Sequence, residues 1–323
     1  MTKFKLLIVV LFWATASASA QDSLANAEKL LAEGRFSKSI AQFDRLITRD
    51  GRKPELLMGL GKSLFGLKEG RRSQALFQEV MGKDKNHSAA SFWIGRVLSR
   101  KGLDGLEQGR ALATADLRDA VSFYRDAADC ASNQKEKFDA RFAAGQALMY
   151  LLDFDEALKE LRFAKEIEPE NDVVGAHMMG ALYRAGDFEE FLALARKRPD
   201  QLDRLREFDA VLRLGRIDEA KSLFLALIEK HGFAGQTRAY DVLDLGCQGI
   251  KNPAAHMDIL EALVTADPKE FYALYYLGYA QAIQGNTEDA EETFGKYLKA
   301  FPNNWRTTRH LANVQRRLGK LTA

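Results

Sequence analysis

The stretch FYALYYLGYAQAIQGNTEDAEETFGKYLKAFP, residues 271–302, decides the fold of this chain. It carries small, aromatic and turn-forming residues at fixed positions: Leu277, Gly278, Gly285, Ala290, Phe294 and Pro302. This order predicts two helices joined at a glycine turn, with a proline after the second helix. The hairpin is about 34 residues long, which is a period typical of helical repeat proteins.

The same spacing recurs upstream, so residues 21–302 are predicted to form an array of about eight such hairpins. Pro169 and Pro268 lie 99 residues apart, which is three units of 33, and Pro302 follows 34 residues later. No run of alternating β-branched residues bounded by turns predicts a strand. Residues 303–323 are expected to form a C-terminal capping helix and a tail.

One hairpin contains an insertion at about residues 103–115. Its first helix carries Ile94 and Gly95, but its second helix is expected to resume only near Asp116. We expect the insertion to lie in the turn between the two helices, on one rim of the array, where insertions in repeat proteins often mark a binding face. The alternative is an additional solvated turn of helix.

These positions resemble the pattern of the tetratricopeptide-repeat (TPR) family. The matching residues are Leu277-Gly278, Gly285, Ala290, Phe294 and Pro302, then Leu60-Gly61 and Phe77, then Ala144-Gly145, Ala157 and Pro169. Leu152 and Leu161 stand where that pattern has Gly and Phe. The resemblance covers nearly all of residues 22–319 and is weakest over residues 201–268. It implies an all-α superhelical solenoid of about eight TPR-like hairpins with a C-terminal capping helix.

Residues 1–20 have the order of a secretory signal peptide. Lys3 and Lys5 precede an apolar run over residues 6–14, and small residues lead to a cleavage site near Ala20. The alternative is an uncleaved anchor, but the apolar run is shorter than the ~20 residues that span a bilayer. We therefore expect a bacterial type of exported protein, periplasmic or secreted, with no stable membrane span after signal cleavage.

Composition and motifs argue against several classes of function. Without residues 1–20, the 47 basic and 45 acidic side chains become 45 of each, so bulk charge does not attract nucleic acid. The sequence has no P-loop, GxSxG or HExxH motif, and its five histidines are scattered. We expect no catalytic residue, no metal and no cofactor. Cys130 and Cys247 both fall in helical patterns, which predicts buried free thiols.

Binding residues come from the resemblance, because first helices of TPR proteins line a concave groove that receives peptides. The positions that match are Lys62, Phe65, Phe92, Arg96, Arg100, Phe142, Gln146, Tyr150, His177, Arg184, Tyr272, Tyr275 and Tyr279. Arg96 and Arg100 lie one helical turn apart, and with Lys62 they are predicted to grip a carboxylate. The alternative is a solvated face for the arginines and packing between repeats for the tyrosines.

The leading hypothesis is a non-catalytic scaffold of the cell envelope that binds a peptide segment or a partner protein in this groove. The alternative is an envelope enzyme, or an enzyme subunit, with a site formed by the insertion and the irregular repeats of residues 200–268. A third possibility is self-association through exposed repeat faces.

Overall fold

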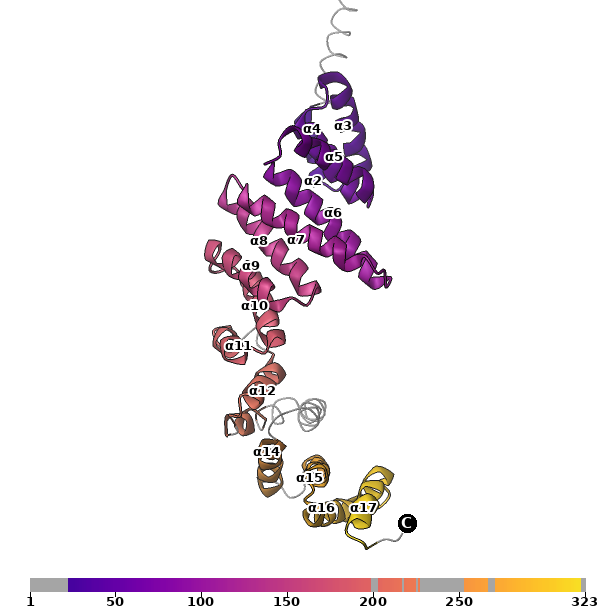
Figure 1. The fold of residues 1–323 in the computed structure, drawn as a ribbon, viewed down its shortest axis with the longest axis vertical. Coiled ribbons are helices and arrows are strands. Elements are labelled where there is room, and N and C mark those ends of the chain that lie inside the picture. The colour runs from indigo at the N-terminus through magenta and orange to yellow at the C-terminus, as the bar shows by residue number, and fades with distance from the viewer. Residues whose placement is uncertain are drawn as a thin grey trace, which may run out of the picture. The chain divides into compact units, whose positions relative to one another are not determined.

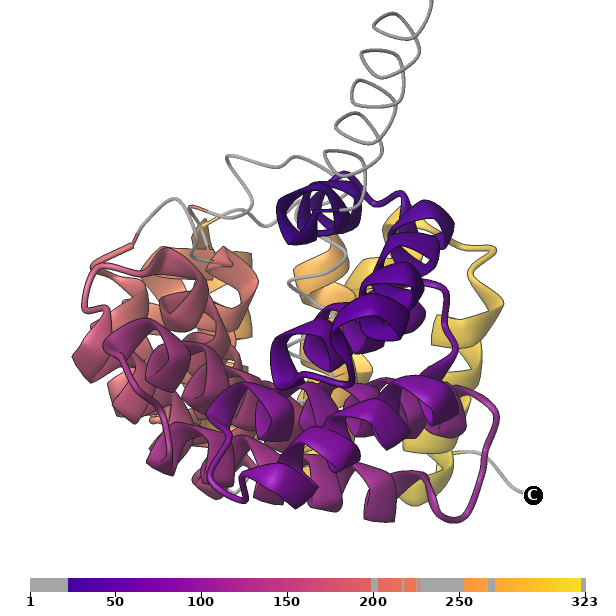
Figure 2. The ribbon, with the colours of Figure 1, turned by 90° about the horizontal axis from the view of Figure 1, so that it is seen from above.

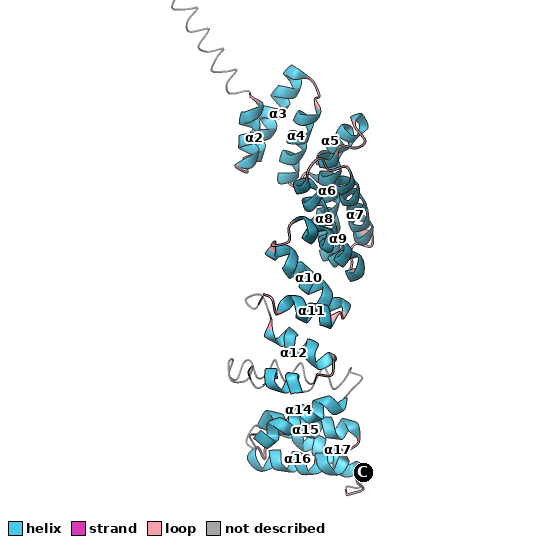
Figure 3. Cartoon of the chain, turned by 90° about the vertical axis from the view of Figure 1, so that its left-hand side faces the viewer, coloured by secondary structure: helices cyan, strands magenta, loops and turns pink. Residues whose placement is uncertain are grey.

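The computed structural model describes residues 23–198, 203–216, 218–224, 226, 253–266 and 271–320, and all of their regular structure is helical (Figures 1 and 3). The signal peptide predicted over residues 1–20 and about half of the irregular repeats predicted over residues 200–268 lie outside these ranges. The chain divides into two compact units, Met1–Ala181 and Leu182–Ala323. They are called the first and the second unit below.

In the first unit the helices are α2 (Leu24–Ala32), α3 (Phe36–Asp50), α4 (Pro54–Gly66), α5 (Gly70–Lys83), α6 (Ser88–Glu107), α7 (Ala113–Asp129), α8 (Gln134–Tyr150) and α9 (Phe154–Ile167). Helix α10 (Asp172–Ala185) runs across the boundary. In the second unit they are α11 (Phe188–Ala195), α12 (Arg204–Arg213), α14 (Pro253–Ala266), α15 (Phe271–Gln284), α16 (Thr287–Ala300) and α17 (Trp305–Arg317).

Consecutive helices of the first unit pack as antiparallel hairpins. From α2 to α9 each helix contacts the next one in the chain, and α4 also contacts α2 and α6, while α6 also contacts α8. Figure 2 shows the helices of the first unit, coloured indigo to magenta, lying side by side. The first helices of successive hairpins therefore share one layer. Neighbouring hairpins bury their apolar faces against each other, because a single helical hairpin cannot cover both of its own faces.

The close approach of the two helices in a hairpin depends on glycine. In the second unit the Phe294 ring of α16 lies so close to Gly278 of α15 that a Cβ there would come within 2.8 Å of ring atoms. In the first unit the Tyr124 ring of α7 lies in the same way on Gly95 of α6, at 2.7 Å. Both rings are buried, and burying such a side chain contributes roughly 1.5–3 kcal/mol.

The turns inside the hairpins contain a residue with positive φ. These residues are Gly34, Lys68, Gly109, Leu152, Gly186, Gly215 and Gly285, and Gly319 takes the same conformation after α17. Leu152, at φ 60°, closes α8 with hydrogen bonds from its own N–H to Met149 O and from Asp153 N–H to Leu148 O. Leucine therefore adopts the left-handed conformation that favours glycine at the end of a helix.

The predicted insertion, residues 103–115, is divided between helix and turn. Its first five residues continue α6, which ends at Glu107, and α7 begins at Ala113, three residues before the predicted start at Asp116. Gly102 fits against Leu117 of α7, where a Cβ would lie 2.7 Å from the leucine side chain. The hairpin is therefore longer than its neighbours, and only residues 108–112 form its turn.

The prediction that the Cys130 thiol is buried is wrong. Helix α7 ends at Asp129, and Cys130 is the exposed residue that follows it, with its N–H bonded to Asp126 O. The helical pattern was extended one residue too far, into the capping position. Cys247 lies outside the described residues. Across the described ranges, each helix is too short or too polar to traverse a bilayer.

Candidate functional site

The first unit carries a group of stacked rings and cations, formed by Lys62, Phe65, Trp93, Arg96 and Arg100 and called the cation–aromatic cluster below. Phe65 of α4 and Trp93 of α6 meet edge to face, with ring centroids 5.4 Å apart. Lys62 Nζ lies 5.6 Å and the Arg96 guanidinium 4.7 Å from the Trp93 ring centroid. The Arg100 guanidinium lies 3.6 Å from the centroid of Phe65. Successive cations therefore cover successive ring faces.

Contacts within the cluster hold Arg100 in place, and burial disfavours the charged forms of Arg100 and Lys62. Arg100 Nη1 donates a 2.7 Å hydrogen bond to the backbone oxygen of Phe65, which ties α6 to α4. Burial and the neighbouring Arg96 lower the pKa of Arg100, and burial lowers the pKa of Lys62. Arg96 is exposed, so it remains the most accessible positive group of the three. An anionic partner would therefore meet Arg96 first.

A cavity of about 570 Å³ opens beside the cluster between α6, α7 and α8. It is lined by Ser88, Ala89, Phe92, Trp93, Arg96, Tyr124, Glu136, Asp139, Phe142, Ala143 and Gln146. Two carboxylates, Glu136 and Asp139, line the cavity together with Arg96. The backbone N–H of Ser132 donates to Glu136 and lowers the pKa of its carboxyl, so Glu136 is ionised at neutral pH. The cavity combines apolar rings with charges of both signs.

Phe142 and Gln146 reach from α8 to α10. The Phe142 ring meets the His177 ring edge to face at 5.0 Å, and Gln146 Nε2 lies 3.1 Å from His177 Nε2. His177 Nδ1 lies 2.9 Å from Val173 O. An amide nitrogen and a carbonyl oxygen together fix one tautomer, in which Nδ1–H donates to Val173 and Nε2 accepts from Gln146. These contacts hold His177 in place between α8 and its own helix.

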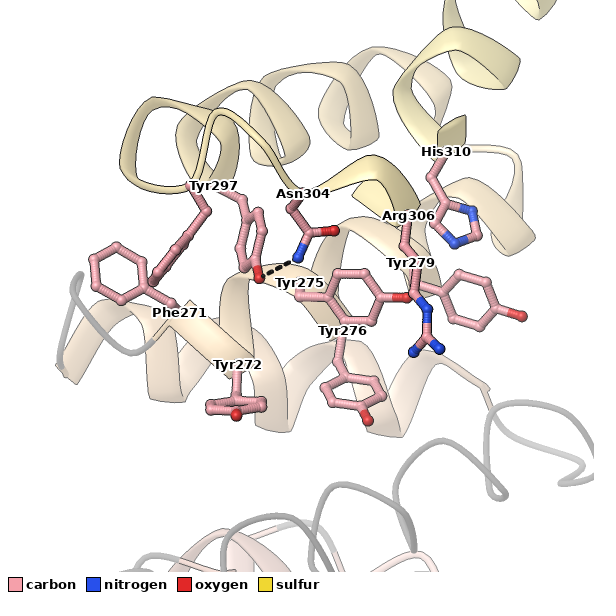
Figure 4. A pocket seen from close by; sticks show the side chains of 10 residues that line it. Phe271, Tyr272, Tyr275, Tyr276, Tyr279, Tyr297, Asn304, Arg306 and His310 are labelled. Carbon is pink, nitrogen blue, oxygen red and sulfur yellow. Dashed lines mark hydrogen bonds between the residues drawn. The ribbon is translucent and has the colours of Figure 1, made fainter. Parts of the chain in front are cut away.

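The second unit carries a different cavity, of about 530 Å³, called the tyrosine pocket (Figure 4). Helices α15, α16 and α17 supply its lining, which consists of Phe271, Tyr272, Tyr275, Tyr276, Tyr279, Tyr297, Phe301, Asn304, Arg306 and His310. Tyr275 lies at its centre, with ring centroids 5.2 Å from Tyr276, 5.8 Å from Tyr297 and 6.1 Å from His310. Asn304 Nδ2 donates to the Tyr297 hydroxyl at 3.1 Å.

Burial controls protonation in the tyrosine pocket. It raises the pKa of Tyr297, so the phenol stays protonated at neutral pH. Burial, followed by the nearby Arg309, lowers the pKa of His310, which keeps the imidazole neutral. The His310 ring stacks on Phe294 at 5.8 Å and meets Tyr279 at 5.2 Å. The wall of the pocket is thus continuous with the ring that packs on Gly278.

The structure groups most of the predicted groove residues, but in separate places. Lys62, Phe65, Arg96 and Arg100 meet in the cluster; Phe92, Phe142 and Gln146 line the adjacent cavity; Tyr272, Tyr275 and Tyr279 line the tyrosine pocket. His177 lies beside Phe142 and Gln146. Tyr150, 56% exposed, and Arg184 line neither cavity.

Sequence reasoning missed residues that the structure adds to these places: Trp93, Tyr124, Glu136, Asp139, Phe271, Tyr276, Tyr297, Phe301, Asn304, Arg306 and His310. Trp93 directly follows Phe92 in the sequence, but it is not one of the first-helix positions that the TPR resemblance supplies. The concentration of aromatic residues over residues 271–301 was the signal that could have found Tyr297 and Phe301. Within the described ranges, no three His, Cys, Asp or Glu side chains are grouped closely enough to hold a metal ion.

Comparison with known proteins supports the repeat fold. A family model described as "Tetratricopeptide repeat" matches residues 258–304. The solved structure of Naa15/Naa10 bound to HypK-THB aligns with 93% of this chain and 44% of its own chain, at 11% identity and a TM-score of 0.57. That alignment shows a shared fold alone.

Two smaller repeat proteins also align. MamA MSR-1 matches 55% of this chain and 92% of its own, at 18% identity and a TM-score of 0.43. TTC0263, a thermophilic TPR protein in Thermus thermophilus, matches 68% of this chain and 96% of its own, at 15% identity and a TM-score of 0.42. No curated protein matches the chain by sequence.

Proposed function

Because the chain is a tetratricopeptide-repeat protein, we propose that it is a non-catalytic scaffold that binds a peptide segment or a partner protein on its first-helix layer. The observation that carries this proposal is the pair of cavities lined by aromatic side chains, one in each unit. Tryptophan, tyrosine and arginine are the residue types that dominate binding energy at protein interfaces. The repeat pattern itself requires only the small residues and rings that pack the hairpins.

The cation–aromatic cluster and the adjacent cavity favour a segment with an acidic side chain next to an apolar one. Arg96 is the exposed cation, and Trp93 and Phe92 supply flat apolar surface beside it. Glu136 lines the same cavity and favours a basic group on the same partner, whereas Asp139 is already paired with Lys135 at 2.8 Å. This arrangement of charge supports selection among partners as well as affinity.

The tyrosine pocket favours an extended segment that presents backbone carbonyls. Its polar groups include the phenol hydroxyls, the Asn304 amide and the Arg306 guanidinium, which can donate hydrogen bonds, and the His310 imidazole; none of its described lining residues is a carboxylate. The aromatic faces supply contact area at a low cost in conformational entropy. The neighbour Naa15/Naa10 is itself an assembly with HypK-THB, which supports partner binding as a use of this fold by analogy only.

Export is part of the same proposal. The order of charged, apolar and small residues over residues 1–20 supports removal of a signal peptide and a location in the periplasm or outside the cell. The mature chain would comprise the repeat array to residue 302 and the capping segment of residues 303–323. Sequencing of the N-terminus of the protein purified from its native host tests this. We expect Gln21 to be the first residue, and an intact Met1 would contradict export by this route.

Affinity capture tests the binding function. We expect the purified chain to retain partner proteins from an envelope extract, and Trp93→Ala or Arg96→Ala to lose partners of the first unit. Tyr275→Ala should lose partners of the second unit. Removing an aromatic hot spot costs about 2 kcal/mol or more, roughly a 30-fold loss of affinity.

Phe163→Ala serves as the matched control, because Phe163 is a half-exposed aromatic on α9 that lines neither cavity. Circular dichroism of each variant verifies that the helices remain folded. If the variants of both cavities retained every partner that the control retains, these cavities would not be the binding sites.

A further inference from the structure

A third cavity lies at the turn end of two adjacent hairpins in the first unit; it shares Phe65 and Arg100 with the cation–aromatic cluster, but the function proposed above does not use the cavity itself. Its volume is about 340 Å³. It lies between the α4–α5 turn and the C-terminal half of α6. The residues that line it are Phe65, Lys68, Gly70, Arg71, Gln74, Val97, Arg100, Lys101, Asp104 and Arg110. Buried Phe65 and Val97 contribute apolar surface, and the charged side chains surround it.

The charge of this lining is strongly unbalanced. Five of its ten residues are basic, namely Lys68, Arg71, Arg100, Lys101 and Arg110, and Asp104 is its one carboxylate. Lys101 has a partner just outside the lining, Asp116 of α7, at 2.7 Å. Even with Asp104 and Asp116 both counted, positive groups outnumber negative ones by three. Like charges gathered in one place repel each other, and a multiply charged anion relieves that repulsion.

The insertion supplies one wall of the cavity. Asp104 and Arg110 both belong to residues 103–115, and Arg110 lies in the α6–α7 turn. The turn is closed by the Arg110 N–H, which donates to Gly105 O at 2.8 Å. A Cβ at Gly105 would lie 3.5 Å from Arg110 Nε, so the arginine side chain passes directly over the glycine. Without the added length of α6 and its turn, this cation would not reach the cavity.

The backbone at the start of α5 adds to the positive electrostatic potential of the cavity. Gly70 is the first residue of α5, and the N-terminus of this helix has no side-chain cap. Its leading N–H groups carry the partial positive charge of the helix dipole. Gly70 has no side chain to block approach to them. This feature supports the site that the basic side chains and the cavity define.

We propose that the cavity binds an anion of the phosphate class that carries at least two negative charges, and that residues 103–115 are retained to complete this site. Arginine favours this class because its planar fork of N–H groups pairs with two oxygens of a phosphate at once. Arg71 and Arg110 line the cavity from two adjacent hairpins, and Arg100 lines it from α6. An anion held there joins the two hairpins at their turn ends.

Isothermal titration calorimetry with inorganic pyrophosphate tests the proposal on the full chain at fixed ionic strength. We expect one site with a dissociation constant of about 100 μM or lower, which corresponds to a free energy of binding of roughly −5.5 kcal/mol. The double variant Arg71→Gln/Arg110→Gln should weaken binding at least tenfold. Arg72→Gln is the matched control, because Arg72 neighbours Arg71 on α5 but pairs with Glu69 at 2.6 Å and does not line the cavity.

Two results would overturn the proposal. One is equal pyrophosphate binding by the wild type and the double variant, with circular dichroism showing that both are folded. The other is equal binding of citrate, a tricarboxylate of similar charge, because this would show general anion attraction without preference for phosphate. A phosphate monoester, O-phosphoserine, forms the last arm: tighter binding than inorganic phosphate supports a phosphate carried by a larger ligand, and equal binding supports a free anion.

Discussion

The cavity beside the cation–aromatic cluster of the first unit and the tyrosine pocket of the second both adjoin the same kind of joint between helices. In each unit a second-helix ring packs on a first-helix glycine, Tyr124 on Gly95 and Phe294 on Gly278. Their surfaces differ in chemistry. In the first unit Lys62 and two arginines already occupy the ring faces, whereas in the second the rings lie against one another, with hydroxyl groups between them.

This difference shows that the repeat pattern determines the positions of the packed aromatic rings but not the charge or hydrogen-bonding groups of the surface around them. A glycine on the first helix sets the depth at which the second-helix ring packs, and this requirement recurs in both units. Residues around this joint are free to vary, because the close contact between the ring and the glycine does not depend on them. Recognition in the first unit should therefore depend on charge and salt, and recognition in the second unit on shape and hydrogen bonding.

The largest expected effect comes from removing the shared ring. Phe294→Ala should destabilise the second unit by about 3–5 kcal/mol, because it leaves a cavity on Gly278 and removes the ring on which His310 stacks. Hydrogen-exchange mass spectrometry should show lost protection over α15–α17 and unchanged protection over α4–α8. Tyr124→Ala is the matching change and should give the reverse. Equal loss in both units after either change would refute their independence.

The buried carboxylates give a second comparison between the units. Glu160 binds Arg125 at 2.5 Å and Arg141 at 3.0 Å, and Glu207 binds Arg196 at 3.1 Å and Arg204 at 2.6 Å. The two glutamates are equally buried. Their partners differ in exposure, since the Arg141 side chain is 15% and the Arg125 side chain 38% exposed, whereas those of Arg196 and Arg204 are 40% and 46% exposed.

We therefore expect Glu160→Ala to cost about 3 kcal/mol and Glu207→Ala about 1 kcal/mol. Removing Glu160 leaves the mostly buried Arg141 with only the exposed Asp129 as its partner, at 2.6 Å, whereas the partners of Glu207 can turn into water. Urea unfolding followed by circular dichroism measures both free energies. A larger cost for Glu207→Ala would show that the exposure of the arginines does not control the penalty.

The sequence was sufficient to predict the helical repeat, because the residues that pack one hairpin lie close together in the sequence and the same pattern recurs along the chain. Gly278, Ala290 and Phe294 are separated by whole turns of helix, so periodicity alone places them at the joint. The turn at Gly285 followed in the same way. A feature that recurs along the chain can be recognised without knowledge of the tertiary structure.

The functional surfaces were predictable only in part, because they depend on contacts between hairpins that differ from one pair to the next. Arg100 lies on α6, and no local pattern indicates that it donates to Phe65 O on α4. Tyr297 stands on a second helix, yet it lines the tyrosine pocket together with first-helix residues. The basic cavity escaped prediction for the same reason, since Arg71 and Arg110 are brought together only by packing of two hairpins.

The residues with positive φ in the turns also differ between the two units, and changing them should have a smaller effect on stability. The second unit uses glycine at each described position with positive φ, whereas the first also uses Lys68 and Leu152. Leu152→Gly should stabilise the first unit by about 1 kcal/mol, because a non-glycine residue in the left-handed conformation costs roughly 1–2 kcal/mol and glycine regains part of it. Leu152 is 67% exposed, so little packing is lost. The melting temperature measures the gain, and Gly285→Ala should lower stability by a similar amount in the second unit.

The smallest expected effect is a pH dependence confined to the second unit. Burial and Arg309 lower the pKa of His310 in the folded state, so the unfolded chain binds the proton more readily. The resulting stability is present above the unfolded pKa of about 6.5 and is lost as pH falls toward the folded pKa. Melting at pH 7.5 and pH 5.5 should show a lower midpoint at pH 5.5, accompanied by lost exchange protection in α15–α17. His310→Phe should reduce this pH difference, because the ring is retained and the titrating group is removed. An undiminished pH difference in His310→Phe would assign the dependence to the carboxylates paired elsewhere, such as Glu291 with Lys320.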